Sequence, residues 1–222
     1  METLIQLSYI VSAVLFILGL KMLSSAKTAV RGNLLSALGM LIAVLATLVS
    51  RETDTYWWIL IGVVLGSLIG AVAALRVKMT SMPEMVALFN GSGGIASLLV
   101  GWAEYHRFYG QYSGFSTDGV SLIAVYLAVL IGGVTFTGSV IAYAKLAERI
   151  NSKPLLFSGQ QIVNGLLFVV VILAGLAFLI DPNAPLAYAA LLVVVALSLV
   201  LGVMLTVPIG GADMPVVISL LN

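Results

Sequence analysis

Residues 55–75 read TYWWILIGVVLGSLIGAVAAL and contain no Asp, Glu, Lys or Arg. A helix of about 20 apolar residues crosses the roughly 30 Å hydrocarbon core of a bilayer, so this stretch predicts a membrane-spanning helix. Six other stretches also lack charged residues, and each has at least 18 residues. Together they predict seven complete membrane-spanning helices, near residues 4–23, 33–50, 56–75, 82–103, 120–146, 161–180 and 186–206.

An eighth apolar stretch begins at Met214 and reaches Asn222. Nine residues of helix rise only about 13 Å, less than half of the hydrocarbon thickness. We therefore expect an all-α, polytopic transmembrane bundle of seven complete helices and the start of an eighth. Because the connections are too short to form a soluble core, residues 1–222 are expected to be one transmembrane domain, truncated before its last helices and before any cytoplasmic domain.

The composition excludes several classes of function. Only 9% of the 222 residues are charged, against about 25% in an ordinary soluble domain, and the mean hydropathy is +1.17. Because there are no cysteines, this chain forms no disulfide, thiolate zinc site or iron–sulfur cluster. The net charge of +1 offers no clustered basic surface for nucleic acid.

The basic residues between the helices predict the orientation, because cytoplasmic loops carry an excess of Lys and Arg. When the connections are assigned alternately to two sides, one side receives only Arg51 and Arg107. The other side receives eight basic residues: Lys21, Lys27, Arg31, Arg76, Lys78, Lys145, Arg149 and Lys153. We therefore expect the second side in the cytoplasm and the N-terminus outside.

Three of the spans carry small residues along one face. In 56–75 the face consists of Gly62, Gly66, Gly70 and Ala74. Such stripes let neighbouring helix backbones approach closely, so tight packing is one interpretation. The alternative is that polar members of the stripes line a hydrated path. The other two faces are Ala87, Asn90, Gly94, Ser97 and Gly101, and Ala128, Gly132, Thr135, Ser139 and Ala142.

Two segments open with nearly the same Met-Pro motif. Ser81-Met82-Pro83-Glu84 leads to Asn90, and Asp213-Met214-Pro215 leads to Asn222, so that each asparagine follows its proline by seven residues. Proline is tolerated at the start of a helix, and seven residues place each amide roughly 10 Å into the bilayer. Because both helices are expected to start in the cytoplasm, the motif suggests a parallel repeat.

Asn90 and Asn222 are candidate site residues, because an amide in hydrocarbon is costly unless it is paired. Either the two amides clasp helices together by hydrogen bonds, or they orient water in a proton or ion path. Asparagine does not itself carry a proton, so a path needs a titratable group, and Glu84 and Asp213 are the nearest acids on these helices. The alternative role of both acids is helix capping.

Four segments stand out: 76–84 (RVKMTSMPE), 133–140 (GVTFTGSV), 152–154 (SKP) and 210–217 (GGADMPVV). Together they resemble the beta subunits of the proton-translocating NAD(P) transhydrogenases. The resemblance implies a nine-helix membrane segment followed by a cytoplasmic NADP(H)-binding domain. It implies that inward proton movement drives hydride transfer from NADH to NADP+, with NAD(H) held by alpha subunits. It also implies a bacterial cytoplasmic (inner) membrane and a dimer of protomers.

The resemblance also implies roles for individual residues. Asp213, Asn222 and Ser139 match polar residues of the family's proton path, whereas the family's membrane histidine corresponds to Asn90 here. Either another chain supplies the titratable group, or water ordered by Asn90 replaces it. With Glu84 these residues form the expected proton path. No catalytic, nucleotide-binding or metal-ligating residue is expected in this chain, which alone would catalyse nothing.

Two other classes of function stay open. An ion-coupled carrier is expected to hold an acid near the middle of the membrane, whereas every acid here lies near the end of a span. A structural anchor for soluble enzymes would tolerate Asn90→Leu and Asn222→Leu with activity retained, whereas a proton path would not.

Overall fold

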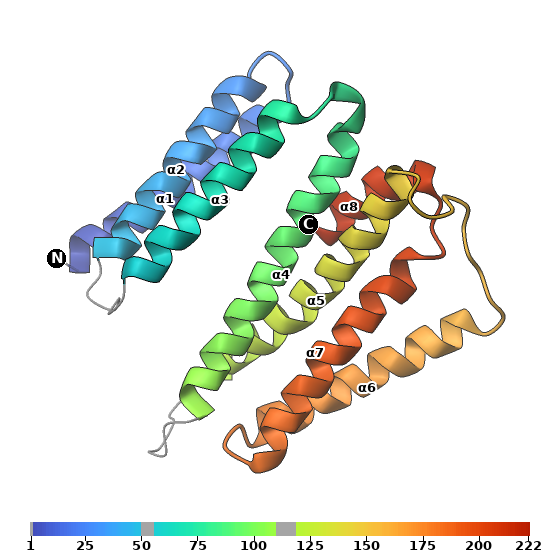
Figure 1. Ribbon diagram of the computed structural model, residues 1–222. Helices are drawn as coiled ribbons and strands as arrows, with labels where there is room; N and C mark the ends of the chain where they lie inside the picture. Colours follow the sequence, from blue (N-terminus) through green and yellow to red (C-terminus); the bar gives the residue numbers. More distant parts are fainter. Residues whose placement is uncertain (1, 50–55, 110–118) are drawn as a thin grey trace. The chain divides into compact units, whose positions relative to one another are not determined.

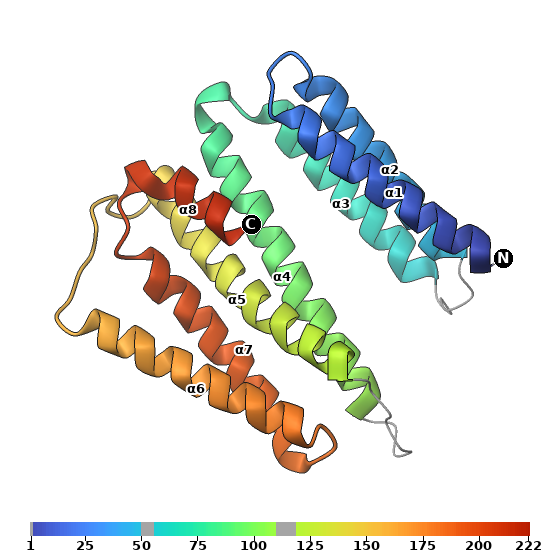
Figure 2. The same ribbon diagram turned by 180° about the vertical axis from the view of Figure 1, so that it is seen from behind.

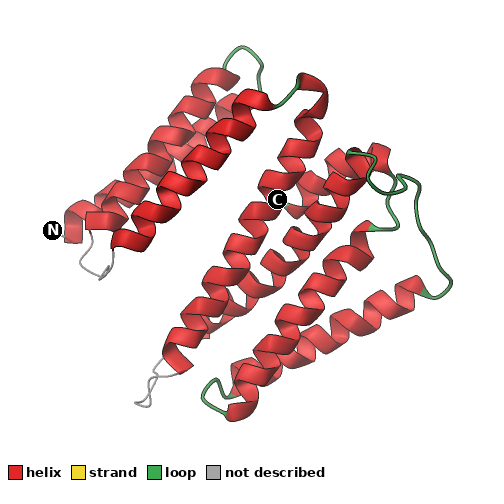
Figure 3. Ribbon diagram, viewed as in Figure 1, coloured by secondary structure: helices red, strands yellow, loops and turns green. Residues whose placement is uncertain are grey.

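The computed structural model describes residues 2–49, 56–109 and 119–222, which form helices and loops without strands (Figures 1 and 3). Seven of the helices are long and apolar enough to cross a membrane. This confirms the predicted all-α bundle of seven spans and the start of an eighth. The helices are α1 (Glu2–Leu23), α2 (Ala29–Val49), α3 (Tyr56–Arg76), α4 (Met82–Tyr109), α5 (Gly119–Leu146), α6 (Gln160–Ile180), α7 (Pro185–Thr206) and α8 (Met214–Leu221), and the 3₁₀ turns are η1 (Met79–Ser81) and η2 (Gly211–Asp213).

Several helices extend past their uncharged stretches, and α4 and α2 are two examples. The fourth span was predicted to end near residue 103, but α4 continues to Tyr109, and Arg107 lies 3.7 Å from Glu104 one turn away. Similarly, α2 begins at Ala29 and includes Arg31. Charged residues are excluded from hydrocarbon but not from helices, so they mark where the apolar region ends and not where the helix ends.

The chain divides into two compact units, residues 1–76 and 77–222. In the first unit α1 and α2 pack side by side (Figure 2). Glycine makes this contact possible, because a Cβ at Gly19 would lie 2.8 Å from the carbonyl oxygen of Gly32, and a Cβ at Gly39 would lie 2.9 Å from that of Ser12. The close contact therefore depends on glycines on both helices.

The small-residue stripe of α3 is not a packing surface among the described residues. A Cβ at Gly62, Gly66 or Gly70 would meet no described atom within 4 Å, and no residue of α3 is buried. The helix contacts α2 near its start, where the Tyr56 hydroxyl donates a hydrogen bond to the Leu48 carbonyl at 3.2 Å. Within the described residues of the first unit, the stripe therefore does not form the tight packing that was one of its two interpretations.

In the second unit α5 is the central helix. It packs against α4, α7 and α8, while α6 packs mainly on α7 (Figures 1 and 2). Apolar side chains from four helices fill the space between them, including Leu98, Val129, Phe178 and Leu191. A smaller cluster formed by Ala87, Ala142, Met214 and Ile218 joins the start of α8 to α4 and α5.

Candidate functional site

Asn90 and Ser139 form a hydrogen bond between α4 and α5. The Asn90 Nδ2 donates to the Ser139 Oγ at 2.9 Å. Asn90 is half-buried and Ser139 is completely buried. A buried hydroxyl needs a partner in an apolar environment, and the amide provides it. The interhelical clasp that the sequence allowed for Asn90 is therefore present, with Ser139 as its partner.

This hydrogen bond depends on the close approach of two glycine-bearing faces. A Cβ at Gly94 would lie 2.7 Å from the backbone nitrogen of Phe136, and a Cβ at Gly132 would lie 2.6 Å from that of Leu98. One turn earlier, a Cβ at Gly91 would meet the Cβ of Ser139 at 3.2 Å. Tight packing, one of the two interpretations of these stripes, is confirmed for α4 against α5.

Gly94→Ala is expected to lower the free energy of unfolding of the protein in detergent by about 1–3 kcal/mol, because the added methyl group collides with rigid backbone. Its melting temperature should fall accordingly. The neighbouring Gly93→Ala is the matched control, since a Cβ there meets nothing within 4 Å. Alanine forms helix better than glycine by about 1 kcal/mol, so the control should unfold at the same or a higher temperature. Equal melting temperatures for the two variants would contradict this packing.

The first two turns of α8 pack on the same part of α5. The Thr135 Oγ1 donates a hydrogen bond to the Leu221 carbonyl at 2.9 Å. A Cβ at Gly138 would lie 2.8 Å from a methyl group of Leu221, so glycine is needed there for α8 to approach. Thr135 and Gly138 thus fix the end of α8, where Asn222 lies.

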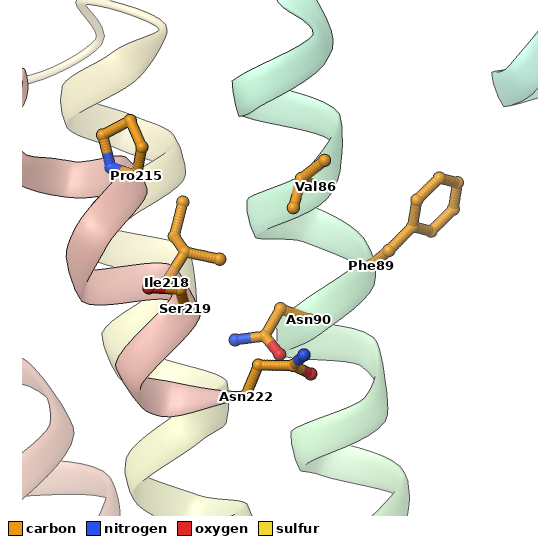
Figure 4. Close-up of a pocket in the computed structure, with 7 residues that line it drawn as sticks. All are labelled: Val86, Phe89, Asn90, Pro215, Ile218, Ser219 and Asn222. Atoms are coloured by element: carbon orange, nitrogen blue, oxygen red, sulfur yellow. The ribbon is translucent and has the colours of Figure 1, made fainter. Parts of the chain in front are cut away.

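Asn90 and Asn222 lie next to one another in the space between α4 and α8 (Figure 4). Both side chains line two adjoining grooves, with volumes of about 450 Å³ and about 220 Å³. The larger groove is otherwise lined by Val86, Phe89, Pro215, Ile218 and Ser219. The smaller one adds polar and small groups from α4 and α5: Gly93, Gly94, Ser97, Gly132 and Thr135. The structure therefore brings Asn90, Ser139 and Asn222 into one polar site.

The two Met-Pro motifs fold in the same way. Lys78 and Gly210 are both extended, with ψ of 150° and 153°. After each of them a 3₁₀ turn leads directly into the helix. The Ser81 amide donates a hydrogen bond to the Lys78 carbonyl at 2.9 Å, and the Asp213 amide donates the equivalent bond to the Gly210 carbonyl at 3.1 Å. The local repeat expected from the sequence is therefore present in the backbone of the two motifs.

Glu84 and Asp213 lie at the starts of α4 and α8, away from the asparagine pair. Neither lines the two grooves. Glu84 is half-buried in the first turn of α4. Asp213 occupies the N-cap position of α8 but is exposed, and its side chain makes no capping hydrogen bond. Its carboxylate is therefore not used as a helix cap.

Lys145 has a position that the sequence did not suggest. It lies in the last turn of α5, as the predicted span 120–146 implies, but instead of facing the cytoplasm as a loop charge it is only 2% exposed. Its Nζ donates to the carbonyl oxygens of Val207 at 2.5 Å and Ile209 at 2.6 Å. Its sequence distance from these partners explains why no local pattern pointed to the contact.

Comparison with known proteins identifies the family. The model of the NAD(P) transhydrogenase beta subunit family matches residues 5–222. Two curated relatives, each named NAD(P) transhydrogenase subunit beta and both from Rhodospirillum rubrum, are 40% identical to this chain over 223 residues. The match covers all of this chain and 47% of each relative, so the chain spans about half the length of these relatives. The chain therefore belongs to the NAD(P) transhydrogenase beta subunit family.

Proposed function

We propose that residues 1–222 form the membrane part of a proton-translocating transhydrogenase and contain part of its proton path. The observation that carries this proposal is the polar site of Asn90, Ser139 and Asn222 between helices that are otherwise apolar. Polar residues inside membrane spans are costly and often mark ion or proton pathways. The family membership of the chain supports the same function.

In this proposal the asparagines orient water and do not bind the proton themselves. An amide offers both donors and an acceptor, so the pair is suited to hold a short chain of hydrogen-bonded water in the grooves. Both grooves are open at the surface of residues 1–222. Because exposed amides are unfavourable in hydrocarbon, we propose that further membrane helices of the complex cover the site and that one of them supplies the titratable group missing at Asn90.

The remaining parts of the enzyme are proposed to lie outside this chain. NAD(H) binds to the alpha subunit and NADP(H) to a cytoplasmic domain, in a dimer of protomers in a bacterial cytoplasmic membrane with the N-terminus of this chain outside. Proton binding can drive hydride transfer only if the protonated and deprotonated states differ in their affinity for nucleotide. The start of α8, with Asp213 exposed, is suited to transmit this difference to the cytoplasmic domain.

The proposal is tested with the complete complex in liposomes. The rate of NADPH formation from NADH and NADP+ is measured with and without an imposed proton gradient, and again after a protonophore is added. We expect an inward gradient to accelerate the reaction and the protonophore to remove the acceleration. Hydride transfer at the same rate in all three conditions would show that this chain is an anchor for soluble enzymes.

A further inference from the structure

The buried Lys145 lies where three segments of the second unit meet. These segments are the end of α5, the connection after it, and the loop between α7 and α8. The Lys145 Nζ donates to two carbonyls of that loop, Val207 and Ile209. Val207 is the C-cap of α7, and a cationic group is favourable at the C-terminal end of a helix.

In the described part of the chain, no carboxylate lies within salt-bridge distance of Lys145. The ion pair found there joins Arg107 and Glu104. Lysine is almost never fully buried unless it is paired, because its ammonium group must give up its hydrating water. An apolar side chain of similar volume would fill the same space without this cost. A methionine, however, would leave the Ile209 carbonyl without this donor and the Val207 carbonyl with only the Leu155 amide, at 3.3 Å. The contribution specific to lysine is therefore to hold these carbonyls in place.

Two further hydrogen bonds extend the contact toward η2. The Ser152 Oγ donates to the Lys145 carbonyl at 2.9 Å, and the Gly211 amide donates to the Ser152 carbonyl at 2.8 Å. Gly211 passes close to Ser152, since a Cβ there would lie 3.0 Å from the Ser152 Cβ. The loop is thus held at Val207, Ile209 and Gly211.

The held loop leads directly to Asp213. The Asp213 amide bonds to the Gly210 carbonyl at 3.1 Å, and Met214 is completely buried. A shift of the loop is therefore expected to move Asp213 and the start of α8, and α8 carries Asn222 into the polar site. We propose that Lys145 is a positioning residue, which acts through the α7–α8 loop to set the place of Asp213 and the register of α8.

This inference rests on the proposed function only for its effect on turnover, so its test begins with a measurement independent of activity. Hydrogen exchange of residues 207–213 is followed in the complete complex. Charge-assisted hydrogen bonds contribute more than neutral ones, so Lys145→Met should accelerate exchange in this segment by about tenfold. Lys145→Arg should show a smaller acceleration. Lys153→Met is the matched control, because Lys153 is exposed nearby.

Unchanged exchange in Lys145→Met would overturn the inference whether or not the complex responds to a proton gradient. If Lys145→Met does not fold, Ser152→Ala removes only the bond to the Lys145 carbonyl. This milder variant should also accelerate exchange of residues 207–213, and no acceleration in it would likewise overturn the inference.

Turnover then tests whether Lys145 acts through Asp213. Lys145→Met should slow gradient-driven hydride transfer by about tenfold, within the range typical of coupling energies. Residues that act through one another show non-additive effects. The double variant with Asp213→Asn should therefore be no slower than Asp213→Asn alone. Multiplied effects would show that Lys145 only supports the fold and would overturn the positioning role.

Discussion

Asp213→Asn is expected to reduce gradient-driven hydride transfer by about 100-fold, within the range of coupling free energies, because Asp213 is proposed to transmit the effect of the proton to the cytoplasmic domain. The folded complex should remain intact for two reasons. The Asp213 side chain makes no capping hydrogen bond that the substitution would remove, and asparagine is as favourable as aspartate at an N-cap. The measurement is NADPH formation in liposomes under an inward proton gradient, normalised to folded complex.

Asp181→Asn is the matched control for this variant. This variant also replaces a carboxylate with an amide, but at the opposite end of the helices. Asp181 directly follows α6 and accepts a hydrogen bond from the Asn183 amide. We expect its turnover to stay near that of the unmodified complex. Normal gradient-driven turnover in Asp213→Asn would mean that the Asp213 carboxylate has no role in coupling.

Asn90→Leu is expected to reduce gradient-driven turnover by about 10- to 100-fold, the size of a typical coupling free energy. The substitution removes the donor to the Ser139 Oγ and the amide that lines both grooves. Hydrogen bonds between membrane helices contribute only about 0.6 kcal/mol on average, so the packing of α4 on α5 should survive. Turnover and melting temperature are measured on the same preparation.

Ser92→Ala provides the control on the same helix, because the Ser92 Oγ is exposed and bonds to the Phe89 carbonyl within α4. We expect this variant to turn over normally. If Asn90→Leu and Ser92→Ala have equal turnover, Asn90 acts only as an interhelical clasp and the grooves are not part of a proton path.

The spans were predictable because the membrane excludes charge. Stretches without Asp, Glu, Lys or Arg gave all seven long helices, with ends that differ by a few residues where Arg31 and Glu104 lie inside helices. The length of an apolar stretch matches the part of a helix that lies in hydrocarbon, and the helix itself can continue beyond it. The count of basic residues assigned Lys145 to the cytoplasmic side but did not show that its side chain is buried.

The helix contacts were only partly predictable. Small-residue faces show where a backbone can approach, but not whether another helix lies there. The faces with Gly94 and Gly132 meet one another, whereas the face with Gly62 and Gly66 meets no described atom. The contact of Gly19 with Gly32 was not expected at all. Pairing depends on which helices are neighbours, and that information is not local in the sequence.

The candidate site was accessible because its residues break an apolar pattern. Asn90 and Asn222 were found as amides at equivalent places after two Met-Pro motifs, and the structure brings them together (Figure 4). The partner of Asn90 within hydrogen-bond distance is Ser139, 49 residues away along the chain. The acids at the helix starts, Glu84 and Asp213, do not line the same grooves.

The central claim, that the site of Asn90, Ser139 and Asn222 conducts protons coupled to hydride transfer, is tested most directly by measuring both fluxes together. The complete complex is placed in liposomes that contain a pH-sensitive dye, and nucleotide reduction is followed while the internal pH is recorded. We predict a change of internal pH in step with hydride transfer, and loss of this change in Asn90→Leu. Hydride transfer without any change of internal pH in the unmodified complex would contradict the account.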